Sequence, residues 1–111
     1  MTPEQILQQE FCYEFTKGMQ ARMLQGFYRY GPCEANVKTE DLVKLAQGRI
    51  DKYLATGNTE HLLDAGNFLM LEFRWPKAVN AHFKVDDGIG KIRPRYWSQW
   101  ARQWFYRWEG D

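Results

Sequence analysis

Cysteine and histidine are scarce in this chain of 111 residues, which contains two of each. Cys12 and Cys33 match no zinc-ligand spacing and are too few for a disulfide framework. His61 and His82 give no Cys–His or Ser–His–Asp order at these spacings. We therefore expect free thiols in a reducing cytoplasm, and a chain without a metal, a cofactor or a catalytic nucleophile.

Long apolar runs are also missing. The first residues, Met-Thr-Pro-Glu-Gln, have neither the basic start nor the apolar stretch of a signal peptide. No run approaches the roughly 18–20 apolar residues that span a bilayer. These absences predict a cytoplasmic protein with no membrane partner.

No charge of one sign dominates, since 15 Lys and Arg face 14 Asp and Glu for a net charge of +1. This balance is far from that of a dedicated DNA-binding domain. The charges are unevenly placed: residues 1–73 carry 7 basic and 10 acidic residues, and residues 74–111 carry 8 and 4. The basic end, which also holds many aromatic residues, is compatible with an anionic partner.

Apolar residues recur at helical spacing in four segments. The expected helices span residues 3–24, 40–56, 60–74 and 96–108. Thr2, Pro3 and Gln5 have the pattern of a capping box with proline at the first helical position. Thr39 is expected to cap the second helix, and Gly57 to end it in the left-handed conformation. The chain is therefore predicted to be one all-α domain, a compact four-helix fold over residues 1–111.

Two irregular segments interrupt this pattern. Residues 26–32, Gly-Phe-Tyr-Arg-Tyr-Gly-Pro, are expected to break the first helix. Residues 76–94 are expected to form a long irregular loop before the predicted C-terminal helix, and loops longer than about 12–15 residues are usually functional or mobile. The helix over residues 60–74 is the most apolar and is expected to be the centre of the core. Its predicted buried arc contains Leu62, Leu63, Gly66, Leu69, Met70 and Phe73, with Phe68 and Leu71 on the opposite side.

Acidic pairs four residues apart occur on two of the expected helices. Glu10 and Glu14 would share one face of the first helix, and Glu60 and Asp64 one face of the third, with Asn67 a turn further on. If the two faces met, four carboxylates would converge in a site suited to Mg²⁺ or Mn²⁺. The alternative is that these residues solvate the outer faces of their helices.

The segment from Asn58 to Phe73 resembles the metal-binding helix of MazG-type all-α nucleotide pyrophosphohydrolases. The resemblance implies metal ligation by Glu60 and Asp64, with Asn67 positioning a phosphate or ribose. The Glu-Glu-x-x-Glu helix of that family has no counterpart here, and Glu60 and Asp64 are four residues apart where the family has three. A metal-dependent nucleotide hydrolase, or a degenerate relative that still binds nucleotide, is therefore the alternative function.

A second resemblance covers residues 49–60 and 64–68, Glu72-Phe73, Pro76 and Ala81-His82-Phe83. Together these residues resemble small phage and prophage proteins of unassigned function. The resemblance implies an accessory protein of a mobile element, in the cytoplasm of a host cell. Factors for host take-over and counter-defence are common at this size.

Four tryptophans, Trp97, Trp100, Trp104 and Trp108, occupy an arc of about 80° on the expected C-terminal helix. This stripe either completes the core or forms an interface, including one for self-association. The candidate partner-binding residues around it are Arg93, Arg95, Tyr96, Arg102, Tyr106 and Arg107. Trp, Tyr and Arg dominate interface hot spots and stack on bases.

These patterns predict a non-enzymatic phage or prophage accessory protein. It would bind and occlude a host protein, or sequester a nucleotide, through the basic aromatic end. Counter-defence or host modulation, as by an anti-CRISPR-like inhibitor, is the most concrete form of this prediction. A nucleic acid and a second copy of the chain are the other candidate partners.

Overall fold

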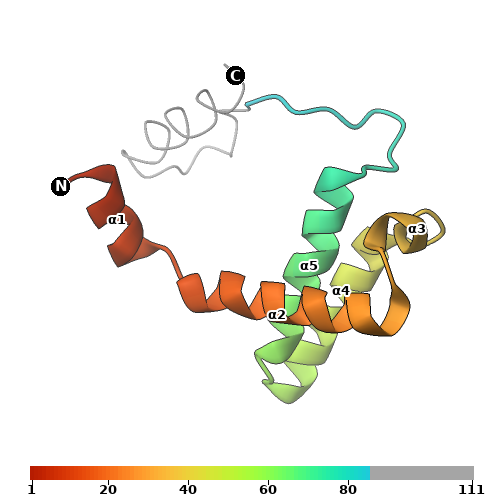
Figure 1. Ribbon diagram of the computed structural model, residues 1–111, viewed down its shortest axis with the longest axis horizontal. Helices are drawn as coiled ribbons and strands as arrows, with labels where there is room; N and C mark the ends of the chain where they lie inside the picture. Colours follow the sequence, from red (N-terminus) through yellow and green to blue (C-terminus); the bar gives the residue numbers. More distant parts are fainter. Residues whose placement is uncertain (86–111) are drawn as a thin grey trace. The chain divides into compact units, whose positions relative to one another are not determined.

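The computed structural model of the protein describes residues 1–85, to which all structural statements below refer. They form five helices and no strand: α1 (Pro3–Glu10), α2 (Tyr13–Tyr30), α3 (Cys33–Val37), α4 (Leu42–Thr56) and α5 (Glu60–Arg74) (Figure 1). The all-α prediction is confirmed for this part of the chain. The chain divides into two compact units, Met1–Lys77 and Ala78–Asp111, and the five helices belong to the first. The prediction of one domain over residues 1–111 stays a prediction.

The helix ends follow local sequence signals at most places. The Thr2 hydroxyl accepts a hydrogen bond from the Gln5 amide at 3.2 Å, and Gln5 Oε1 accepts one from the Thr2 amide at 2.7 Å, which confirms the capping box. Gly57 ends α4 in the left-handed conformation with φ of 74°, as predicted. The cap of α4 is Asp41, whose Oδ1 accepts from the Lys44 amide at 3.1 Å, so the prediction of Thr39 is wrong.

The first predicted helix is two helices. Its chain leaves the helical conformation at Phe11 and Cys12, which have extended backbones with ψ of 139° and 98°. After this break, α2 continues through Gly26 and stops only at Gly31, whose φ is 81°. A glycine inside a helix costs only about 1 kcal/mol, which neighbouring helix-forming residues can offset. Residues 33–37, which lie outside the four predicted helices, form the short helix α3.

The core lies where α3, α4 and α5 meet. Its buried apolar residues are Val37, Leu42, Ala46, Ala65 and Leu71. The most apolar helix, α5, packs against both α2 and α4, so its apolar contacts extend over two sides. For this reason Leu71 is buried while Leu69 and Phe73 remain about half exposed, contrary to the predicted arc.

Glycines allow α2 to cross α5 closely (Figure 1). A Cβ atom on Gly18 would lie 2.8 Å from Leu63 Cδ1, and one on Gly66 would lie 3.0 Å from Phe15 Cζ. Real Cβ contacts are longer than this, so the two helices meet at a distance that these glycines permit. The crossing places the α2 residues that follow Gly18 beside α5.

We expect alanine at Gly18 and at Gly48 to have different effects on stability. A Cβ on Gly48, inside α4, meets nothing within 4 Å, so Gly48→Ala should gain about 0.5–1 kcal/mol from helix propensity alone. Gly18→Ala should bring the same gain in helix propensity, but that gain should be offset because Leu63 must shift to make room for the Cβ. Urea unfolding of the two variants measures the difference. Equal stabilisation would contradict the close crossing.

Candidate functional site

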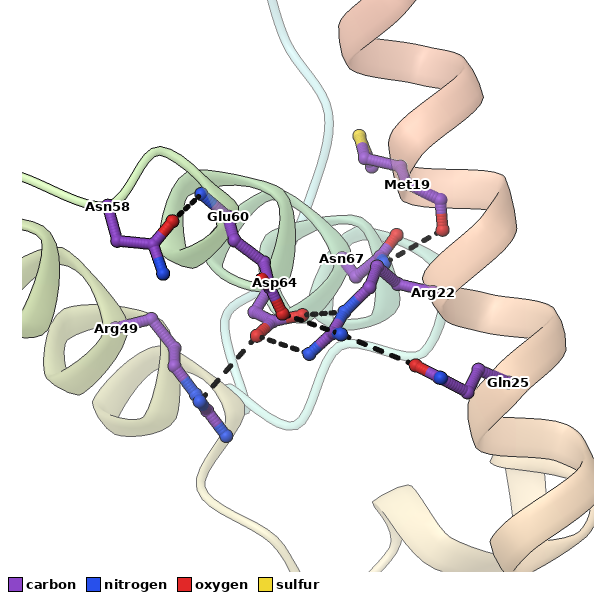
Figure 2. A network of polar contacts seen from close by, with 8 residues as sticks. All are labelled: Met19, Arg22, Gln25, Arg49, Asn58, Glu60, Asp64 and Asn67. Carbon is purple, nitrogen blue, oxygen red and sulfur yellow. Dashed lines mark hydrogen bonds and ion pairs between the residues drawn. The ribbon is translucent and has the colours of Figure 1, made fainter.

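The acidic pair of α5 binds an arginine of α2 (Figure 2). Arg22 Nε and Nη2 donate to the two carboxylate oxygens of Asp64 at 3.0 and 3.1 Å. Arg22 Nη1 lies 2.7 Å from Glu60 Oε1 and 3.3 Å from Gln25 Oε1. Arg49 of α4 approaches Asp64 Oδ2 at 3.6 Å. The pair predicted as metal ligands therefore has two cationic partners that the sequence pattern did not reveal.

The four carboxylates do not converge. Glu10 is the last residue of α1 and Glu14 lies in the first turn of α2, so the break at residues 11–12 removes the single helix on which they were to share a face. Glu60 and Asp64 contact Arg22 instead. Within residues 1–85 no three metal-ligating side chains gather into a site. The prediction that helices one and three would assemble a Mg²⁺ or Mn²⁺ site from these residues is thus corrected.

In the ion pair between Arg22 and Asp64, the carboxylate is well shielded from solvent. The side chain of Asp64 is 12% exposed and that of Arg22 is 34% exposed. Hydrogen bonding to Asp64 raises the pKa of Arg22 above its ordinary value. Arg22 therefore carries its positive charge at ordinary pH. The stabilisation that the bond provides is fully present below the pKa that Arg22 has in the unfolded chain. The pair is a fixed link between α2 and α5.

Asn67 also links these two helices. It is 7% exposed, and its Nδ2 donates to the backbone carbonyl of Met19 at 3.0 Å. Its Oδ1 is buried and has no hydrogen-bond partner among the described residues. The contact with Met19 gives Asn67 a structural role at the helix crossing.

A groove of about 540 Å³ lies between α2 and α5 beside this crossing. We call it the methionine groove; it is lined by Thr16, Met19, Gln20, Met23, Leu24, Asn67 and Met70. No charged residue lines it. Its volume falls within the roughly 300–1,000 Å³ typical of small-molecule sites. Three flexible thioether side chains can adapt their shape to an apolar occupant.

Helical spacing places the lining residues of the methionine groove. Met19 and Met23 are four residues apart on α2, as are Gln20 and Leu24, so each pair lies on one side of the helix. Both methionines are half-buried, and Leu24 is 60% exposed. In the sequence, the pair Met19 and Met23 was the feature that could have indicated this groove. Methionine is as typical of an adaptable surface as of a core.

The six candidate partner-binding residues predicted from the basic aromatic end lie outside the described residues. They are Arg93, Arg95, Tyr96, Arg102, Tyr106 and Arg107. The four tryptophans of the predicted C-terminal stripe lie outside them as well. These assignments stay predictions.

Over residues 1–85, no helix is both long enough and apolar enough to cross a membrane. Comparison of the chain with protein-family models, curated proteins and solved structures yields no match.

Proposed function

We propose that this chain is a non-enzymatic binding protein whose methionine groove takes up an apolar segment of a partner protein and thereby occludes it. The groove itself is the observation that supports this function. Its lining offers apolar and neutral polar atoms only, which suits apolar side chains and disfavours a charged ligand. Amphipathic helices commonly bind in such grooves through apolar residues spaced three or four apart.

The resemblance to small phage and prophage proteins supports a host protein as the partner. In this proposal the chain acts in the host cytoplasm as a counter-defence or host-modulating factor, such as an anti-CRISPR-like inhibitor. The mechanism is steric, and no bond is made or broken. The hydrolase alternative gains no support from the acidic pair of α5, because Arg22 occupies both oxygens of Asp64.

The basic aromatic end supplies a second contact in this proposal. Its arginines would pair with acidic residues around the bound segment, since Arg and Tyr are enriched in interface hot spots. Arg95, Arg102 and Arg107 are the residues that test this contact. A triple alanine variant at these positions separates the role of this end from that of the methionine groove.

A carboxylate placed at the groove should abolish partner binding. Leu24→Glu is suitable because Leu24 lines the groove and is 60% exposed, so its replacement costs little folding energy. Leu54→Glu on α4 is the matched control, since Leu54 is 73% exposed and lies outside the groove. The measurement is quantitative capture of host-lysate proteins by each variant, followed by titration of the captured protein. Burying an unpaired carboxylate should weaken that complex at least ten-fold.

Four outcomes of this experiment are informative. Loss of the captured protein with Leu24→Glu but not with Leu54→Glu supports the groove. Its retention by Leu24→Glu rejects the groove, and loss only in the triple arginine variant assigns binding to the basic aromatic end. Capture of the chain by itself, with a mass that rises with concentration in light scattering, replaces the host partner with a second copy.

A further inference from the structure

A second cavity, of about 270 Å³, lies where α2, α4 and α5 meet and differs chemically from the methionine groove. Its charged lining residues are Arg22, Arg29, Arg49 and Asp64. With Glu60, which also pairs with Arg22, three guanidinium groups meet two carboxylates. We call it the arginine cavity. A surface with this excess of positive charge favours an anionic ligand.

The three arginines are not equivalent. Arg22 is saturated, because Nε, Nη1 and Nη2 all have partners in Asp64, Glu60 and Gln25 (Figure 2). Arg49 makes only the 3.6 Å approach to Asp64 and lies 5.9 Å from the centre of the Phe68 ring. Most of its donors therefore have no partner within residues 1–85.

The side chain of Arg29 has no hydrogen bond or ion pair with any residue of the described range. It follows Arg22 by seven residues on α2, two turns further along the same face. Arg29 and Arg49 thus approach the arginine cavity from two different helices with donors to spare. A planar guanidinium group can donate two parallel hydrogen bonds to two oxygens of one phosphate group.

Gly26 leaves room for such a ligand. It lies inside α2 between Arg22 and Arg29 and lines the arginine cavity. A Cβ on it would meet nothing within 4 Å, so no close packing requires glycine here. A glycine inside a helix is destabilising relative to alanine. Its evident effect is to keep the wall of the cavity free of a side chain.

Aromatic residues form another part of the lining. Tyr30 is 73% exposed at the end of α2, and Phe68 of α5 is half-buried. An exposed aromatic ring beside an anion site suits a ligand that also carries a planar group, because bases stack on such rings.

We propose that the arginine cavity binds a phosphate monoester, with Arg29 and Arg49 holding the phosphate and Tyr30 contacting the organic part. The bond between Arg22 and Asp64 holds α2, which carries Arg29 and Tyr30, against α5. This site does not depend on the methionine groove. It also differs from the nucleotide sites predicted from the sequence, which were the basic aromatic end and the acidic pairs.

Isothermal titration calorimetry with AMP, ribose 5-phosphate, inorganic phosphate and adenosine tests this proposal. Hydrogen bonds to charged groups are among the strongest in proteins, so Arg29→Gln and Arg49→Gln should each weaken phosphate-ester binding by about ten-fold or more. Gly26→Leu should do the same by filling the cavity. The matched controls are Lys17→Gln on α2, Lys52→Gln on α4 and Gly48→Leu, none of which lines the cavity.

Binding of AMP or ribose 5-phosphate that is lost in the cavity variants and kept in the controls supports the site. Equal affinity for inorganic phosphate overturns the contact between Tyr30 and the organic part, whereas tighter binding of AMP than of ribose 5-phosphate supports that contact and assigns it to the base. The proposal is overturned if no phosphate compound binds at millimolar concentration, or if adenosine binds as tightly as AMP. Unchanged binding in Arg29→Gln also overturns it, because Arg29 is exposed and its replacement should leave the fold intact.

Discussion

Replacement of Asp64 by alanine is expected to lower the free energy of unfolding by about 2–4 kcal/mol. Asp64 accepts two hydrogen bonds from Arg22, and its side chain is 12% exposed. Without it, the half-buried guanidinium of Arg22 would lose its main partner at the crossing of α2 and α5. The loss of two charge-assisted hydrogen bonds accounts for most of the effect, because the guanidinium would keep only Glu60 and Gln25 as partners. Urea unfolding monitored by circular dichroism measures it.

Glu60 provides the control because it contacts the same guanidinium from a more exposed position, with a side chain 49% exposed. Exposed ion pairs contribute about 0–1 kcal/mol, so Glu60→Gln should change stability by no more than that. The double variant Arg22→Met with Asp64→Leu should recover most of the loss, since it removes the cation together with its main carboxylate, and Glu60, which then loses Arg22, is exposed to water. Equal losses for Asp64→Ala and Glu60→Gln would contradict a fixed link between the helices.

Local chemistry made several helix ends predictable. The capping box at Thr2 and Gln5 depends on residues three apart, and the end of α4 depends on Gly57, whose positive φ few other residues tolerate. The break at Phe11 and Cys12 has no such signal, because neither residue is a helix breaker. Nor does the sequence show that α2 passes through Gly26, where the cost of one glycine is offset along an 18-residue helix.

The candidate sites were less predictable because they depend on which helices meet. A spacing of four residues shows that Glu60 and Asp64 share a face, but not whether that face meets a metal ion or Arg22. Arg22 is 42 residues away from Asp64 in the chain, and no local pattern joins them. The methionine groove likewise depends on which helices meet. Because α2 crosses α5 at Gly18, Met23 and Met70 line the same groove.

The small core makes one further replacement severe. Leu42→Ala is expected to lower the free energy of unfolding by about 2–4 kcal/mol, the usual range for a leucine truncated in a core. Leu42 is 2% exposed and packs in one cluster with Val37 and Leu71, so its loss would leave a cavity where α3, α4 and α5 meet. Only five apolar residues of the described range are buried. A loss of this size would be a large share of the roughly 5–15 kcal/mol that stabilises a typical domain.

Leu54→Ala is the matched control on the same helix, since Leu54 is 73% exposed and both variants change leucine to alanine within α4. Alanine and leucine have similar helix propensity, so this change should stay within about 0.5 kcal/mol. The difference between the two variants therefore isolates burial from helix formation. Chemical denaturation of both proteins gives that difference directly. Near-equal midpoints would show that Leu42 does not pack between α3 and α5, and would remove the core on which the position of the methionine groove depends.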